Sequence, residues 1–162
     1  MGLGQARLSG TFIGVGVGPG DPELLTLKAV AAIRAAPVIA YPAPDRGDAF
    51  ARRIAAPHIP HGRTEIAIRT PMTPERFPDA AVYDAAAAEI GDHLTAGRDV
   101  VCLCEGDPFV FGSFLYLHAR IAPAHPTTVI PGVTSIVAGA SAAGAALASK
   151  NDRLSILPAT LD

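Results

Sequence analysis

The sequence predicts an α/β fold in which a mostly parallel sheet carries helices on both faces. Short apolar runs alternate with segments of helical periodicity along most of the chain, an order typical of parallel sheets. The run from Val100 to Cys104 is apolar throughout, as expected of a strand covered on both sides. With 162 residues, 49% of them hydrophobic, the chain has room for one ordinary domain with its own core.

The first half of the chain alternates between extended and helical patterns. Residues 11–17 are β-branched and apolar and run into glycine and proline, which predicts a strand followed by a loop. Residues 22–35 place apolar side chains at helical spacing and predict a helix. Shorter segments predict a strand at 38–41, a helix at 49–56 and an extended piece at 65–68.

The second half repeats this alternation. Alanine-rich residues 80–95 predict a long helix that stops at Gly97. Four shorter elements follow, namely strands at 100–104 and 127–130 and helices at 113–121 and 133–143. Residues 154–157 predict one more strand, which is either an edge strand or the first strand of a further unit.

Composition excludes several classes of function. The chain has 13 Lys and Arg against 15 Asp and Glu, a net charge of −2 without the basic excess that nucleic-acid binding needs. Residues 136–148 are too short and too interrupted to cross a membrane. The amino-terminal residues lack the apolar core of a secretory signal, so we expect a cytoplasmic protein. Cys102 and Cys104 are expected to be reduced core thiols, and no ligand spacing predicts a metal site.

Three glycine-containing loops carry the functional signal. They read GVGPGDPEL, CEGDPFVFGS and IPGVTS, and each follows an expected strand. Ligands of open α/β sheets bind beyond the carboxyl ends of the strands, so the loops are expected to converge on one crevice. Neither nucleotide-phosphate motif fits: Pro19 and Asp21 stand where a dinucleotide fingerprint needs its third glycine, and no lysine follows a glycine as in a P-loop.

Each polar residue of these loops also has a purely structural interpretation. Asp21 is placed to cap the helix that follows it. Glu105 and Asp107 can accept hydrogen bonds from ligand hydroxyl or amine groups, although an Asp-Pro turn is the alternative. Thr134 and Ser135 are placed either to bind a ligand or to cap a helix.

The runs GVGVGPGDPELLTLKAV, GRDVVCLCEGDPFVFGSFLYLHARI and VIPGVTSIVAGASAAG resemble successive signatures of the tetrapyrrole methylases of corrin and sirohaem synthesis. The stretches PHIP, PMTPE and LPATL are most similar to the branch that methylates precorrin-2 at C-20. The resemblance implies two α/β domains and a homodimer. On that basis we expect residues 1–150 to form the first domain and residues 151–162 to be the opening strand of a second domain that is largely missing.

The resemblance also implies S-adenosylmethionine as methyl donor, with no metal, and a small tetrapyrrole as the partner. Donor-binding positions carried over from the family are Pro19, Glu105, Gly106, Asp107, Val110, Thr134 and Ser135. Expected substrate-binding positions are Gly18, Gly20, Asp21 and Tyr41. Sirohaem-branch relatives have an aspartate after the second strand, but this chain reads AYPAP there, so no catalytic base is transferred.

The reaction implied is methyl transfer to a nucleophilic meso carbon, followed by loss of a proton. Arginines at the rim are candidates to bind the acidic side chains of the substrate, namely Arg46, Arg52, Arg53, Arg63 and Arg69. Three alternatives stay open: a methylase acting on another position or on the cobalt-loaded substrate, a non-catalytic tetrapyrrole-binding module, and an oxidoreductase of Rossmann type.

Overall fold

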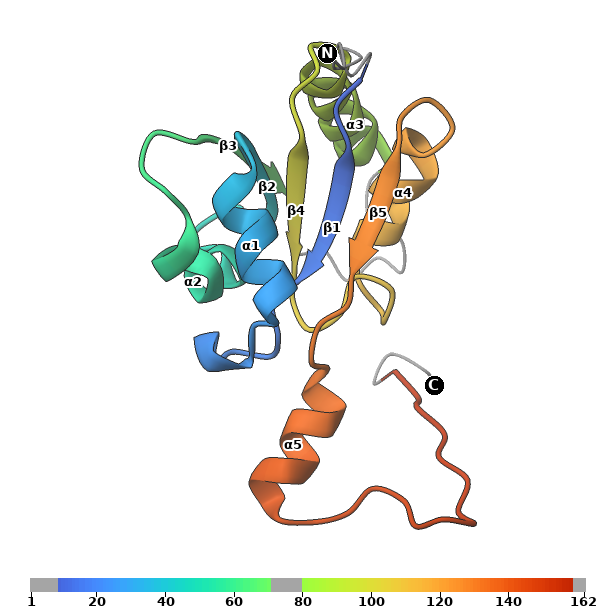
Figure 1. Ribbon diagram of the computed structural model, residues 1–162. Helices are drawn as coiled ribbons and strands as arrows, with labels where there is room; N and C mark the ends of the chain where they lie inside the picture. The colour runs from blue at the N-terminus through green and yellow to red at the C-terminus, as the bar shows by residue number, and fades with distance from the viewer. Residues whose placement is uncertain (1–8, 71–79, 159–162) are drawn as a thin grey trace, which may run out of the picture.

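The computed structural model describes residues 9–70 and 80–158, which contain a five-stranded sheet (Figure 1). Its strands are β1 (Phe12–Gly16), β2 (Val38–Ala43), β3 (Thr64–Arg69), β4 (Val100–Cys104) and β5 (Thr127–Ile130). Their order across the sheet is β3-β2-β4-β1-β5, and every neighbouring pair is parallel. The predicted parallel α/β sheet is therefore confirmed.

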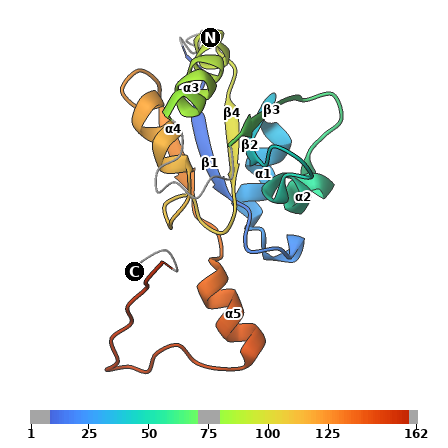
Figure 2. The same cartoon turned by 180° about the vertical axis from the view of Figure 1, so that it is seen from behind.

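Helices cover both faces of this sheet (Figures 1 and 2). One face carries α1 (Leu27–Ala35) and α2 (Phe50–Ala55), and the other carries α3 (Ala80–Thr95) and α4 (Phe114–Ile121). Because side chains alternate along a strand, β1 contributes Phe12 to the core beneath α3 and α4 and Val15 to the core beneath α1 and α2. The sheet thus separates two apolar layers, as the sequence predicted.

The helix predicted over 22–35 is shorter than expected and begins later. A 3₁₀ turn, η1 (Pro22–Leu24), comes first, and the backbone of Leu25 is extended. The Thr26 side chain then accepts a hydrogen bond from the Ala29 N–H at 3.1 Å, which caps the first turn of α1. A second 3₁₀ turn, η2 (Ala56–His58), extends the end of α2.

The carboxyl-terminal region leaves the sheet. The helix α5 (Ser135–Ala143) starts two residues later than predicted because Thr134 is its N-cap, and it ends at Gly144 in the left-handed region. Figure 1 shows α5 standing beyond the ends of the strands, and none of its residues is buried.

The strand predicted at 154–157 is wrong, since described residues 152–158 have no regular secondary structure. A strand forms where a neighbouring strand satisfies its backbone N–H and C=O groups. No strand of the described sheet lies beside this segment. The domain division at residue 150 stays a prediction.

Candidate functional site

A cavity of about 710 Å³ lies at the carboxyl ends of the strands, a size typical of small-molecule sites. The loop after β1 contributes Pro19, the loop after β4 contributes Glu105, Gly106 and Val110, and the segment after β5 contributes Thr134 and Ser135. Segments more than 100 residues apart in sequence therefore meet around one space, as the strand order requires.

The backbones of the loops after β1, β4 and β5 contact one another directly because Gly16, Gly106 and Gly132 occupy the positions where they meet. A Cβ atom on Gly16 would lie 2.5 Å from the Gly132 nitrogen and 2.6 Å from the Gly106 oxygen. The Gly106 N–H donates to the Gly18 oxygen at 2.9 Å, and the Gly18 N–H donates to the Gly106 oxygen at 3.3 Å. These contacts fix the relative positions of the loops after β1, β4 and β5.

Asp107 joins two of these loops through its carboxylate. One oxygen accepts a hydrogen bond from the Phe109 N–H at 2.9 Å, and the other accepts from the Gly132 N–H at 3.0 Å. Asp107 is not among the residues that line the cavity. Among the expected donor-binding residues it is thus the one whose side chain is already engaged in holding the loops.

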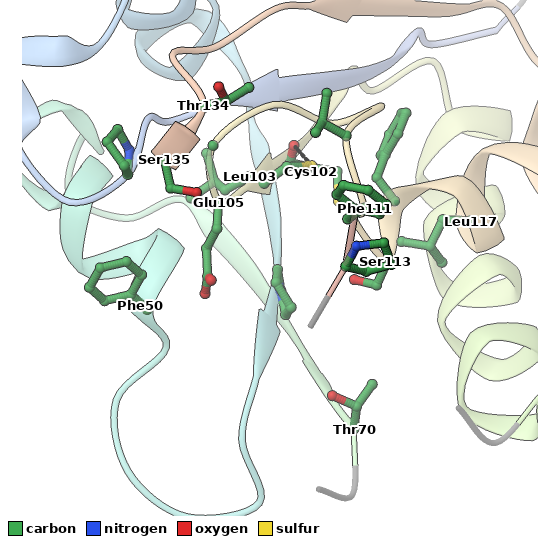
Figure 3. Close-up of a pocket in the computed structure, with 18 of the residues that line it drawn as sticks. Phe50, Thr70, Cys102, Leu103, Glu105, Phe111, Ser113, Leu117, Thr134 and Ser135 are labelled. Carbon is green, nitrogen blue, oxygen red and sulfur yellow. Dashed lines mark hydrogen bonds between the residues drawn. The ribbon is translucent and has the colours of Figure 1, made fainter. Parts of the chain in front are cut away.

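The cavity wall is mostly apolar and carries a single charge. Glu105 is the only charged side chain among the described residues that line the cavity, and no lysine or arginine lines it. Figure 3 shows the Glu105 side chain projecting from its loop into the cavity. Desolvation by the surrounding wall raises the pKa of this carboxyl above its ordinary value. Thr134 lies nearby, but its hydroxyl accepts the Val137 N–H and caps α5.

Phe111 adopts an unusual backbone conformation in the cavity wall. Its φ of 53° is in the left-handed region, the one such non-glycine residue in the described ranges, and an L-residue there costs about 1–2 kcal/mol. Its side chain is 63% exposed. Strained backbone at an exposed aromatic residue is typical of functional sites.

The helices supply cavity residues that the sequence did not single out. Phe50 comes from α2, Tyr83 from α3, and Phe114 and Leu117 from α4. Along the sequence these positions are indistinguishable from core positions, because each lies on the apolar stripe of its helix. Only the packing of the helices around the strand ends turns them toward the cavity.

The four expected substrate positions lie outside the cavity wall. Gly18 pairs with Gly106 through its backbone, and the Asp21 carboxylate accepts the Glu23 N–H in η1 at 2.9 Å. Gly20 follows the lining residue Pro19 but does not itself line the cavity. Tyr41 packs in the layer beneath α1 and α2, where burial raises the pKa of its hydroxyl. Their assignment to substrate binding stays a prediction without structural support.

Most of the candidate arginines are engaged in contacts within the protein. The Arg52 guanidinium pairs with Glu65 at 2.8 Å and lowers the pKa of that carboxyl. Arg63 donates a hydrogen bond to the Arg34 oxygen, and Arg69 donates to the Pro44 and Asp45 oxygens. The Arg53 guanidinium lies over the Phe50 ring, 5.0 Å from its centroid. Arg53 contacts a lining residue through the Phe50 ring, and Arg69 lies between the lining residues Ile68 and Thr70.

Cys102 and Cys104 are free buried cysteines, which confirms the expected core thiols. They also line the floor of the cavity. A hydrogen bond with Cys102 and burial together raise the pKa of the Cys104 thiol, so it is neutral and a poor nucleophile.

Within residues 9–70 and 80–158, no three His, Cys, Asp or Glu side chains are grouped to hold a metal, and no helix is long and apolar enough to span a bilayer.

Known proteins match this chain along nearly its whole length. The family described as Tetrapyrrole (Corrin/Porphyrin) Methylases matches residues 11–162. A precorrin-2 C(20)-methyltransferase of Sinorhizobium sp is 40% identical over 99% of the chain and 67% of the relative. The cobalamin biosynthesis protein CobIJ of Mycobacterium tuberculosis is 39% identical over 94% of the chain but only 32% of the relative.

The same fold occurs in a solved structure of uroporphyrin-III C-methyl transferase from Thermus thermophilus complexed with S-adenosyl homocysteine. It is 30% identical, with a TM-score of 0.60, over 88% of this chain and 51% of that one. The chain therefore spans between about a third and two thirds of the length of these relatives. Of the motifs that carried the resemblance, PMTPE and the last residues of LPATL lie outside the described residues.

Proposed function

Because this chain belongs to the tetrapyrrole methylases, we propose that it is an S-adenosylmethionine-dependent C-methyltransferase that methylates C-20 of precorrin-2 in cobalamin biosynthesis. The observation that supports this most strongly is the match over residues 11–162, whose three signature loops surround one cavity. The relative named for this reaction is similar over nearly the entire chain.

The cavity fits the methyl donor better than a phosphate-bearing cofactor. No lysine or arginine lines it in the described ranges, and its glycine-containing loops carry neither nucleotide-phosphate motif. A donor that combines an adenine, a ribose and an amino acid head group suits apolar walls interrupted by backbone groups, hydroxyls and one carboxylate. This contrast disfavours an oxidoreductase of Rossmann type.

We assign donor contacts to the residues that the loops bring to the cavity, namely Pro19, Gly106, Val110, Thr134 and Ser135. Asp107 acts indirectly, by holding the loop after β4 against the loop after β5. The donor supplies an activated methyl group on a sulfonium. The protein's task is to hold that group in line with the acceptor carbon and to exclude water, and such positioning is worth roughly 7–11 kcal/mol.

Titration calorimetry is expected to detect binding of S-adenosylhomocysteine and none of NADH. In the variant Val110→Asp the affinity should fall at least about tenfold, because the new carboxylate loses its hydration when the donor fills the site. The control is Leu27→Asp, which places the same charge at a side chain that is 90% exposed and outside the cavity. Binding of NADH without S-adenosylhomocysteine would contradict the methylase proposal.

We also propose that the protein is cytoplasmic and acts as a homodimer. Two free cysteines are in keeping with a reducing compartment. Exposed apolar side chains gather on α5 and the segment after it, at Val137, Leu147, Leu154 and Leu157, and such patches are typical of protein interfaces.

Sedimentation velocity over a concentration series is expected to show a dimer, and Val137→Lys should shift it toward monomer because a charge then enters the apolar patch. Leu27→Lys, at an isolated exposed leucine, should leave the dimer intact. A wild-type protein that sediments as a monomer at every concentration would refute the dimer.

A further inference from the structure

Glu105 lies in the cavity wall, is exposed to solvent and has no partner among the described residues. Of the described residues that line the cavity it alone is charged, and no hydrogen bond or ion pair joins it to another described side chain. Desolvation by the cavity wall raises the pKa of its carboxyl above the ordinary value. Its side chain reaches from the loop after β4 into the cavity (Figure 3).

Glu105 is the only carboxylate or basic side chain among the described residues of the cavity wall. The titratable side chains in the cavity wall are Cys102 and Cys104 of β4 and Tyr83 of α3. Burial raises the pKa of Tyr83, and hydrogen bonding with burial raises that of Cys104. The helices α2, α4 and α5 present aromatic, aliphatic and hydroxyl side chains to the cavity and no charge. Among the described residues of the cavity wall, Glu105 is therefore the group best placed to accept a proton.

Methylation of a meso carbon ends with the loss of a proton, which a nearby carboxylate can accept. The acceptor carbon carries one hydrogen, and when it forms a bond to the methyl carbon, that hydrogen must leave as a proton. The other carboxylate of the loop, Asp107, does not line the cavity, and its two oxygens bind backbone N–H groups of Phe109 and Gly132.

Resting on the proposed function, we propose that Glu105 is the general base that removes this proton. The C–H bond of the methylated carbon breaks, its electron pair returns to the conjugated ring, and the proton forms an O–H bond on a Glu105 oxygen. Glu105 then releases the proton to water through the open side of the cavity. A carboxylate in a desolvated wall is a stronger base than one in water, which suits this task.

Glu105→Gln in the complete encoded protein tests this role. We expect S-adenosylhomocysteine to bind within about threefold of wild type, while product formation falls about 100-fold or more, the usual contribution of a general base. With substrate deuterated at the acceptor carbon, the variant should show a primary isotope effect larger than that of wild type. The wild-type rate should rise with pH as Glu105 loses its proton. The rate of the variant should not show this rise.

Two further variants and one spectroscopic measurement sharpen the test. Glu105→Asp should restore part of the rate, and Glu23→Gln, at an exposed carboxylate outside the cavity, should behave as wild type. Carbon-13 NMR of the protein with S-adenosylhomocysteine should show a carboxyl resonance that titrates above the ordinary pKa and is missing from Glu105→Gln.

The outcomes separate the two proposals. If Glu105→Gln retains the wild-type rate and pH profile, the base is elsewhere and the role of Glu105 is refuted, while the methylase function stands. Loss of S-adenosylhomocysteine binding in this variant would also refute it and assign Glu105 to the donor instead. A wild-type protein that neither binds S-adenosylhomocysteine nor transfers methyl groups would refute the proposed function itself.

Discussion

Gly132→Ala is expected to destabilise the protein by about 3 kcal/mol or more, since overpacking at rigid positions has no low-energy relief. A Cβ atom at this position would collide with the Gly106 oxygen and would lie 2.8 Å from two backbone atoms of Gly16. Both neighbours are backbone at the ends of β1 and β4, in the centre of the sheet. They cannot rotate away as a side chain could, so the strand ends must separate.

The matched control is Gly139→Ala in α5. A Cβ atom there meets nothing within 4 Å, and alanine is favoured over glycine inside a helix by about 1 kcal/mol. Urea unfolding followed by circular dichroism is expected to show a lower midpoint for Gly132→Ala and an unchanged or higher midpoint for Gly139→Ala. Equal midpoints for Gly132→Ala and wild type would show that the strand ends can separate at little cost.

Asp107→Ala is expected to lower the free energy of unfolding by about 2 kcal/mol, because two N–H groups lose a charged acceptor. It should also weaken S-adenosylhomocysteine binding at least about tenfold, although Asp107 does not line the cavity. The loss of affinity follows from geometry: without the carboxylate, nothing joins the Phe109 and Gly132 N–H groups, so only the glycine contacts position the loops after β4 and β5 and the loops are held less firmly.

Asp48→Ala is the control for this variant, because Asp48 is exposed and makes no hydrogen bond or ion pair with the described residues. Its unfolding and its binding should match wild type. Calorimetry and urea unfolding on the same preparations separate the two effects of Asp107→Ala. A variant that lost stability but kept full affinity would show that the loops are positioned by their glycines alone.

The alternation of strands and helices was readable from the sequence because each element has its own periodicity. Residues 80–95 and 100–104 match α3 and β4 as predicted, since a long alanine-rich segment and a short apolar run have no competing structure. The start of α1 was misplaced because Thr26, three residues before Ala29, caps the helix, and capping competes locally with the apolar pattern that predicted an earlier start.

The strand expected at 154–157 failed for a different reason. Its apolar residues are compatible with a strand, but a strand also needs a partner, and partners are decided by the whole fold. The described sheet offers none to this segment.

By itself, the sequence determined the parallel sheet, its two apolar layers and the three loops, because periodicity and glycine spacing are local properties of the chain. It could not assign the separate roles of Glu105 and Asp107, two residues apart in one loop. Only the tertiary structure decided that one carboxylate is held by N–H groups from its own loop and the next, while the other is left in an apolar cavity. The reason is physical: hydrogen bonding and desolvation depend on the atoms that surround a group in space, and here those atoms come from the segments after β1 and β5 and from the helices, far away along the chain.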